Sequence, residues 1–269
     1  MVDASVRFLG TGGARFVVAR QLRASGGMWM RFGETQIHVD PGPGALARAL
    51  SSVPPCVPSE LSAIALSHKH LDHAGDVNAM IEAMTHGGFK PRGALLAPRD
   101  AFEGEPVIFP YAARFVPTHH VLASRGGPYR VGDVDVFASV RHRHAVETYG
   151  LHFVRAGTTV SYLPCGRFFE AQIEDYRSFA PDVLIVNVLF YRETIRADHL
   201  TFEDARRLIG EIRPHVAVLT HFGTSMLAQN PRVLALELED ALGLKVYAAT
   251  DGWTLDLARE LPARGESRR

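Results

Sequence analysis

Cysteine is scarce in this chain of 269 residues, and long apolar runs are missing. The two cysteines, Cys56 and Cys165, cannot build the dense disulfide framework of a small secreted protein. The longest apolar stretches, such as 182–190, are far shorter than the roughly 20 residues that span a bilayer. No charged segment followed by an apolar one opens the chain, so no secretory signal is expected. These absences predict a cytoplasmic protein.

An excess of charge of either sign is also missing. The chain carries 29 basic and 29 acidic residues, so no overall field attracts nucleic acid or an anionic membrane. Only three of the basic residues are lysines, a skew that codon usage explains as readily as phosphate binding by arginine does. With 46% hydrophobic and 22% charged residues, the chain has an ordinary globular composition. Its length predicts a single domain over 1–269.

The apolar pattern predicts two β-rich layers with helices outside. Met28 to Phe32 and Thr35 to Val39 flank Gly33-Glu34, a hairpin signal, and the second of these strands ends at Asp40 before a Pro/Gly loop. Further strands are expected over 6–9, 61–66, 131–140, 151–162, 181–189 and 216–220, with a strand pair over 246–257. Helices are expected over 45–50, 74–84, 168–179, 202–212 (N-cap Thr201) and 234–242.

The segment 86–130 is rich in glycine and proline and has weak periodicity. Such a composition predicts short strands and loops that form a lid or one wall of a cleft.

Four candidate metal ligands lie within the heptapeptide Ser67-His68-Lys69-His70-Leu71-Asp72-His73, directly after a predicted buried strand. Residues two apart in an extended segment point the same way, so His68 and His70 can bind one ion. Asp72 and His73 follow where the chain turns toward a helix, and both can face a second ion, because hydrolytic two-metal sites hold their ions about 3.5–4 Å apart. The alternative is a cluster of exposed loop histidines, which the spacing disfavours.

Around this loop the sequence resembles the metallo-β-lactamase superfamily over nearly its whole length. Phe8-Leu9-Gly10-Thr11-Gly12-Gly13 is similar to the opening strand and turn of the tRNase Z and cyclic phosphodiesterase branch. His38-Val39-Asp40-Pro41-Gly42 resembles the first motif of the superfamily, whose Asp orients the metal loop. The resemblance implies an α/β protein with a four-layer αβ/βα sandwich and with the metals at one edge.

Two later motifs extend the resemblance. The segment 144–150 is similar to the third motif, whose His, here His144, joins His68 and His70 in the first metal site. His142 competes for this role, since it lies on the same face of any strand. Leu219-Thr220-His221-Phe222-Gly223 resembles the final motif, whose His joins Asp72 and His73 in the second site.

The chain departs from the superfamily at Cys165, where a bridging Asp normally ends a strand. A buried free cysteine is usually a small hydrophobic residue. One subgroup of zinc β-lactamases nevertheless carries a Cys ligand at the corresponding place, and thiolate is a good zinc ligand. As a ligand, Cys165 would favour zinc over manganese or magnesium, whereas a Cys165 that does not bind would leave the second site weakened.

Asp198-His199 precedes the helix predicted at 202 and resembles a region that phosphodiesterase members use for phosphate contact or leaving-group protonation. Ordinary loop chemistry before a helix is the alternative. Asp72 and His199 are therefore the candidate catalytic residues. The other histidines lack ligand spacing and are expected to be structural or exposed: His38, His86, His119, His120, His152 and His215.

Two divalent ions, zinc before manganese or iron, can share a hydroxide and neutralise charge on an attacked phosphoryl or acyl centre. The expected function is a metal-dependent hydrolase, and the resemblance favours a phosphodiesterase. Lactone, thioester or β-lactam hydrolysis and a non-catalytic metal-binding scaffold are the alternatives. A flavodiiron oxidoreductase is disfavoured, because His70 stands where those proteins carry Glu.

The expected partner is a small-molecule substrate, in the first place a phosphodiester. Neutral net charge and the lack of a long, basic, Gly-rich arm make tRNA an unlikely substrate. A membrane partner is not expected, and a homodimer stays open.

Overall fold

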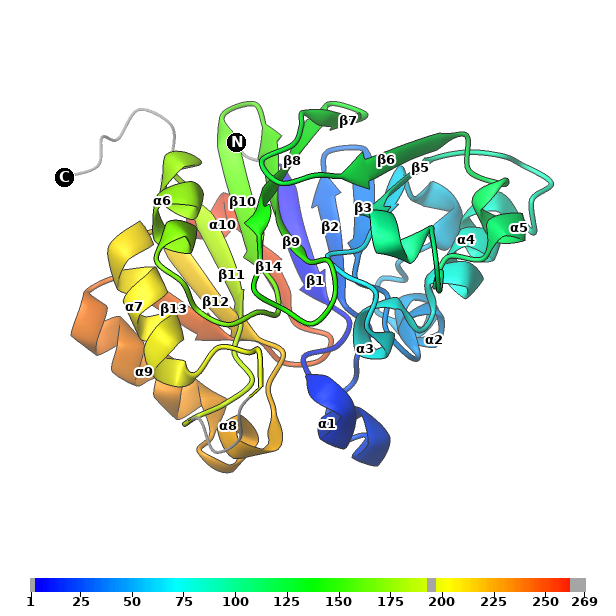
Figure 1. The fold of residues 1–269 in the computed structure, drawn as a ribbon. Coiled ribbons are helices and arrows are strands. Elements are labelled where there is room, and N and C mark those ends of the chain that lie inside the picture. Colours follow the sequence, from blue (N-terminus) through cyan, green and yellow to red (C-terminus); the bar gives the residue numbers. More distant parts are fainter. Residues whose placement is uncertain (1–2, 193–196, 262–269) are drawn as a thin grey trace.

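The computed structural model describes residues 3–192 and 197–261, in which two seven-stranded sheets pack face to face (Figure 1). In spatial order the first sheet comprises β14 Thr254–Asp256, β1 Ala4–Phe8, β2 Met28–Phe32, β3 Thr35–Val39, β4 Ala63–Ala65, β5 Ala94–Pro98 and β6 Thr118–Leu122. In spatial order the second comprises β13 Lys245–Ala248, β12 Val216–Thr220, β11 Val183–Asn187, β10 Thr158–Leu163, β9 Tyr149–Arg155, β8 Val134–Arg141 and β7 Tyr129–Val131.

Both sheets follow the same plan. In the first sheet the pairings from β14 to β3 are antiparallel and those from β3 to β6 are parallel. In the second sheet the pairings from β7 to β10 are antiparallel and those from β10 to β13 are parallel. The parallel strands of both sheets therefore send their carboxyl ends to the same side of the sandwich, where loops can converge.

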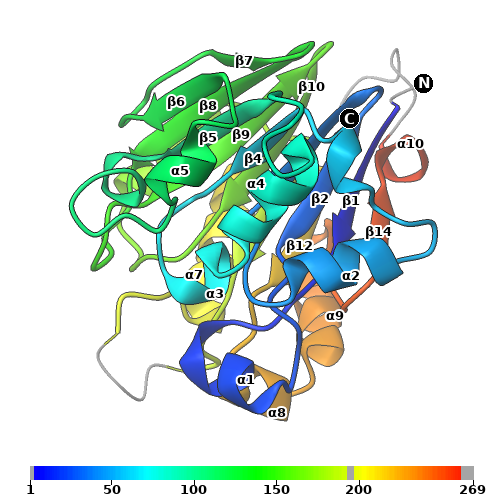
Figure 2. The ribbon, with the colours of Figure 1, turned by 90° about the vertical axis from the view of Figure 1, so that its right-hand side faces the viewer.

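Helices cover the outer face of each sheet (Figures 1 and 2). On the first sheet lie α2 Ala45–Ser51, α4 Val77–Thr85 and α5 Pro110–Ala113; on the second lie α6 Ala171–Ser178, α7 Phe202–Ile212 and α9 Pro231–Leu242. The other α-helices of the described residues are α1 Ala14–Arg20, α3 Leu71–Ala74, α8 Thr224–Ala228 and α10 Leu257–Glu260. The predicted αβ/βα sandwich is confirmed.

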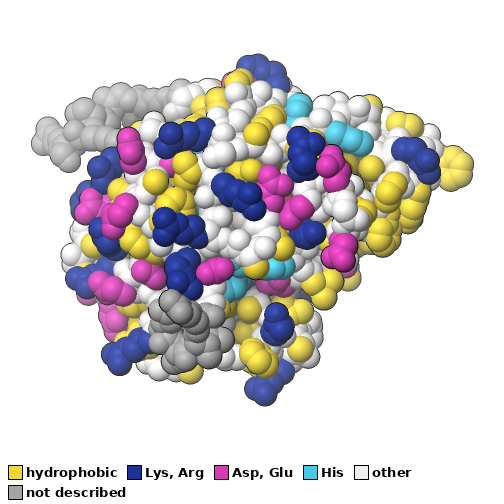
Figure 3. Space-filling view, viewed as in Figure 1, with side chains coloured by type: hydrophobic (Ala, Val, Ile, Leu, Met, Phe, Trp, Pro, Cys, Tyr) yellow, Lys and Arg dark blue, Asp and Glu magenta, His cyan; other side chains and the backbone are white. Residues whose placement is uncertain are grey.

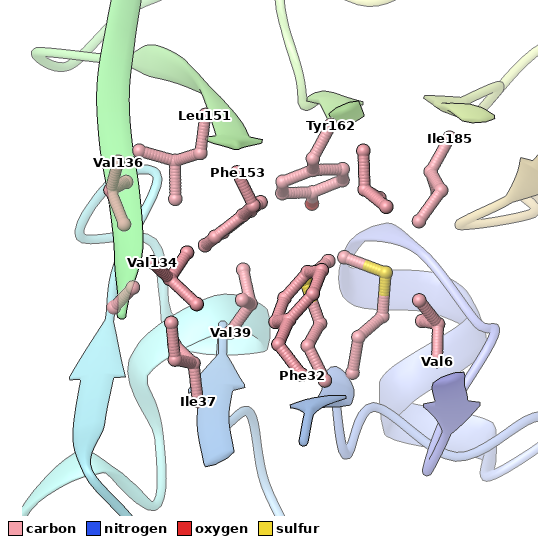
Figure 4. Packing of buried hydrophobic residues seen from close by; sticks show 14 of the residues in the cluster. Val6, Phe32, Ile37, Val39, Val134, Val136, Leu151, Phe153, Tyr162 and Ile185 are labelled. Carbon is pink, nitrogen blue, oxygen red and sulfur yellow. The ribbon is translucent and has the colours of Figure 1, made fainter. Parts of the chain in front are cut away.

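The main core lies between the two sheets. Figure 4 shows Val6, Phe32 and Ile37 of the first sheet facing Phe153 and Ile185 of the second. Two further apolar clusters fill the spaces between each sheet and its helices. Because both faces of β4, β5, β11 and β12 are covered, these strands are buried along their whole length, which is why they read as continuous apolar runs.

Most predicted elements are present, and several have the predicted bounds. The hairpin strands 28–32 and 35–39, the helix 202–212 and the strand 216–220 match the structure residue for residue. Thr201 caps α7 as predicted: its hydroxyl accepts the Asp204 backbone N–H at 3.2 Å, and the Asp204 carboxylate accepts the Thr201 N–H at 2.9 Å.

Three expectations were wrong or incomplete. The predicted strand pair over 246–257 does not pair, because β13 joins β12 in the second sheet and β14 joins β1 in the first. The segment 86–130 forms short strands and loops, as predicted, but the prediction was incomplete because it did not place β5 and β6 in the first sheet. Helix α1 was not anticipated. No helix in the described part of the chain has the length and apolarity needed to cross a membrane.

Candidate metal centre

Asp40 and the candidate metal ligands come from five separate loops at one edge of the sandwich. Asp40 follows β3, the segment 67–73 follows β4, His144 follows β8, Cys165 follows β10 and His221 follows β12. Asp40 and His221 are each the first residue after a strand and have left-handed φ angles of 54° and 59°. This uncommon conformation turns the chain sharply at the sheet edge, a type of strain that clusters at functional sites.

His68, His70 and His144 form the first cluster. Their ligand atoms all lie within 4.8 Å of one another. His144 donates its Nδ1 hydrogen to the carbonyl of Asp198 at 2.9 Å, so its Nε2 lone pair faces His70 Nδ1 at 3.0 Å. His68 is fully buried, and its Nε2 has no hydrogen-bond partner among the described residues. A buried imidazole nitrogen without a partner is costly unless a ligand occupies it.

Asp72, His73 and His221 form the second cluster. His73 Nε2 lies 2.9 Å from His221 Nε2, and the same His221 atom lies 3.2 Å from Asp72 Oδ2. Asp72 and His73 lie on α3, a single helical turn, whereas the sequence predicted a loop. Gly13 packs directly on the His221 ring, and a Cβ at this position would overlap the ring.

Cys165 lies between the clusters. Its Sγ is 3.5 Å from His73 Nε2 and 3.6 Å from His221 Nε2, and it forms a third group of ligand atoms with His68 and His73. Asn187 donates to the same sulfur at 3.6 Å. The thiol thus contacts the second cluster and also groups with His68 of the first.

Asp40 positions both clusters, as the motif resemblance implied. Its Oδ2 accepts hydrogen bonds from His73 Nδ1 at 2.8 Å, from the Ser67 hydroxyl at 2.6 Å and from the Tyr162 hydroxyl at 2.9 Å. Ser67 Oγ also lies 3.0 Å from His68 Nδ1. One buried carboxylate therefore orients His73 directly and His68 through Ser67, which points the Nε2 atoms of both rings into the site.

The sequence did not point to the roles of Ser67, Tyr162 and Asn187. Asn187 donates to the Tyr162 hydroxyl at 3.0 Å, and both side chains are buried. The available signal was a polar residue at the end of an otherwise apolar strand, which in a parallel sheet marks the loop edge.

The two clusters differ in the pKa values of their ligands. Burial lowers the pKa of His68 to about 3, and it also lowers the pKa values of His70 and His144. Burial acts in the same direction on His221, but the charge of Cys165 and the hydrogen bond to Asp72 raise its pKa to about 9. The metal-free first cluster is therefore neutral at pH 7, whereas His221 of the second is protonated.

Two anionic groups, the Cys165 thiolate and the Asp72 carboxylate, balance this charge. Burial raises the pKa of the Cys165 thiol, but the charges of His221 and His73 outweigh it and hold this pKa well below the usual range. Burial acts in the same direction on Asp72, and the charge of His73 with the hydrogen bond from His221 holds its pKa below the usual range. Against burial, the charges of Asp72 and Cys165 raise the pKa of His73 well above its ordinary value.

The competing histidine, His142, takes a different place. Its ring nitrogens lie 3.1 Å from the Cys165 carbonyl oxygen and 3.1 Å from the Tyr176 hydroxyl, so both are engaged. His38 on β3 and His152 on β9 are buried. His38 hydrogen-bonds the Gly26 carbonyl, and His152 hydrogen-bonds the Ser161 hydroxyl. His199 lies at the surface of the site, with its ring centroid 5.1 Å from that of His144 and 6.2 Å from that of His221.

A divalent metal fits this donor set. Imidazole, carboxylate and thiol groups converge from separate elements, and the unpartnered His68 Nε2 lies among them. Figure 3 shows histidine side chains at the surface of this face. His70 and Asp72 are only half-buried, and they line a pocket of about 440 Å³, so the centre is open on one side. An open side is typical of a catalytic metal site, whereas structural sites are closed.

Fold and site together define a metallo-hydrolase. The chain belongs to the beta-lactamase superfamily, because the model of the "Beta-lactamase superfamily domain" matches residues 35–222. The uncharacterized protein MJ1374 of Methanocaldococcus jannaschii is 30% identical over 259 residues, which cover 93% of this chain and 94% of that protein.

Solved structures share the fold. The metallo-beta-lactamase fold protein YhfI from Bacillus subtilis superposes with a TM-score of 0.72 at 20% identity, over 94% of this chain and 99% of YhfI. In sequence, YhfI, described as a probable metallo-hydrolase, is 24% identical over 74% of this chain and 80% of its own length. A diphosphatase from the PhnP family superposes with a TM-score of 0.65 at 18% identity, over 95% and 98% of the two chains.

Proposed function

We propose that the chain is a phosphodiesterase that hydrolyses a small-molecule phosphodiester with two divalent metal ions, zinc in the first place. The observation that carries the proposal is the adjacency of two ligand clusters. The rings of His68 and His73, one from each cluster, have centroids only 4.0 Å apart. Cys165 groups with both of these residues.

In this proposal His68, His70 and His144 hold one ion, and Asp72, His73 and His221 hold the other, with Cys165 as a ligand between them. When bound, the ions act as Lewis acids that activate water and neutralise charge on the attacked phosphorus centre. A thiol among nitrogen and oxygen ligands favours zinc.

The protein's own groups would supply orientation and proton transfer. Asp40 holds His73 and, through Ser67, His68 in the tautomers that direct Nε2 toward the ions. Asp72, which accepts the Ala14 backbone N–H at 2.9 Å, remains ionised as a ligand. His199 lines the same pocket and is placed to give a proton to the leaving alkoxide.

Two observations support a phosphodiester over an acyl substrate. The opening Gly10-Thr11-Gly12-Gly13 turn resembles the phosphodiesterase branch, and the PhnP-family structural neighbour is named a diphosphatase. The pocket over the clusters has a volume of about 440 Å³, which suits a small organic molecule better than a tRNA. Lactone and thioester hydrolysis remain the chemical alternative, because the same ions polarise carbonyl groups.

A substrate panel tests the proposal. Protein loaded with zinc, manganese or iron is assayed with bis-p-nitrophenyl phosphate, cyclic nucleotides, lactones and thioesters. We expect diester hydrolysis that is strongest with zinc and absent from the metal-free protein. The His68→Ala variant, purified in parallel, controls for contaminating phosphatases. Hydrolysis of lactones or thioesters without diester cleavage would replace the proposal by the acyl alternative.

A further inference from the structure

Helix α1 forms one wall of the pocket over the metal clusters. It leaves the body of the sandwich just after β1 and lies at the edge where the site opens (Figures 1 and 2). Besides the candidate ligands and His199, the pocket is lined by Ala14, Arg15 and Val18 of this segment and by Leu71 of α3.

The wall is attached to the second cluster. The backbone N–H of Ala14 donates to Asp72 Oδ2 at 2.9 Å, and that of Gly13 donates to the Phe222 carbonyl, beside His221, at 3.1 Å. Val17 anchors the helix from its inner side, since it is only 1% exposed. The first turn of α1 is therefore held in place relative to the metal ligands.

Among the described residues that line this pocket, Arg15 is the only lysine or arginine. It is exposed, and within 3–192 and 197–261 no acidic group pairs with it. Arg167, by contrast, is committed to Asp198 at 3.3 Å. A guanidinium that stands free beside a binding pocket is suited to a carboxylate or phosphate group of a ligand.

The same wall offers apolar surface. Leu71 is 72% exposed although it lies between the ligands His70 and Asp72, and Val18 is half-buried beside the pocket. Pockets for small molecules combine such apolar surface with a few placed polar groups that fix orientation.

We propose that α1 selects the substrate: Arg15 binds a second anionic group, while Val18 and Leu71 contact the carbon skeleton that links it to the group at the metals. This inference rests on the proposed metal centre and narrows the substrate class to small diesters that carry another negative charge.

A matched pair of ligands tests this role without hydrolysis. Propylphosphonate and 2-carboxyethylphosphonate have chains of equal length and differ by one carboxylate. Calorimetric titration of the zinc-loaded protein should show tighter binding of the carboxylate ligand. Arg15→Ala should weaken that ligand about fivefold and leave propylphosphonate unchanged, and Arg15→Lys should restore part of the loss. Arg20→Ala, on the same helix but outside the pocket lining, is the matched control.

Any of three other results would overturn the inference. Equal affinity for the two ligands, an equal loss of both in Arg15→Ala, or binding of neither would remove Arg15 from substrate selection. The diesterase proposal is judged separately by the substrate panel. A protein that shows the expected calorimetric pattern but cleaves no diester would keep the role of Arg15 and refute the phosphodiester reaction.

Discussion

The two ligand clusters are neighbours, yet they prepare for a metal ion in opposite ways. The first consists of three imidazoles whose pKa values are all lowered by burial, so they are neutral and available at pH 7. The second contains the carboxylate of Asp72 and lies against the thiol of Cys165, whose charges raise the pKa values of His73 and His221. The first cluster therefore offers neutral nitrogen ligands, whereas the second contains charged groups that pair with one another.

Two groups of ligand atoms that lie equally close together need not bind a metal ion with equal affinity. An ion entering the first cluster displaces no proton, whereas an ion entering the second must displace protons that already satisfy buried charges. We therefore expect the first cluster to bind its ion more readily near neutral pH.

The largest expected effect comes from deleting a ligand of either cluster. His68→Ala should abolish hydrolysis and remove the ion of the first cluster, because the cluster then retains only two imidazoles. His221→Ala should remove the second ion and leave the first in place. Elemental analysis of both variants measures this, with His119→Ala on the edge strand β6 as a control. Full metal content in His68→Ala would contradict the assignment.

The next effect concerns proton transfer and should not touch either cluster. His199→Ala should lower turnover by roughly 10²–10⁴, the contribution of a lost general acid, while metal content stays unchanged. Steady-state kinetics on the best substrate of the panel, with metal analysis of the same sample, measures it. Unchanged kinetics would return His199 to an ordinary loop role.

A third effect separates the two interpretations of Cys165. As a ligand, its thiolate should resist alkylation in the metal-loaded protein and react after chelation, as detected by mass spectrometry. Cys56, which is also buried but lies outside the site, serves as the internal control and should behave alike in both states. Cys165→Ser should weaken the second ion, and Cys165→Asp should shift preference from zinc toward manganese. A Ser variant with two ions and full activity would show that Cys165 is no ligand.

The smallest expected effect is the pH dependence of metal binding, which differs between the two clusters. Because the pKa of His221 is raised to about 9, its proton must leave when the second ion binds, and affinity for that ion should rise as pH increases toward 9. Because burial lowers the pKa values of His68, His70 and His144 below their ordinary value, affinity for the first ion should change little above pH 7. Calorimetry in buffers of different ionisation enthalpy counts the protons released. Equal release for both ions would remove the distinction.

Local patterns predicted the elements that carry strong periodicity or a cap. The hairpin around Gly33-Glu34 and the helix after Thr201 were predicted with their observed bounds, because turn and capping residues act on their immediate neighbours. Helix α1 was missed, since its short sequence follows a glycine turn and buries only Val17. The predicted pair over 246–257 failed because the choice of a partner strand depends on the whole sheet.

The sequence alone is sufficient to predict the candidate ligands from their residue types and spacing, the positions of the strands that end near them and the family resemblance. Which of the candidate ligands face one another depends on the tertiary structure. It engaged His142 with Tyr176 and left His144 beside His70, and it placed Cys165 against His73 and His221. It also brought Arg15 to the pocket wall. The four side-chain contacts join residues that are 34 to 92 positions apart in the chain, so they depend on how two sheets pack, which no local pattern encodes.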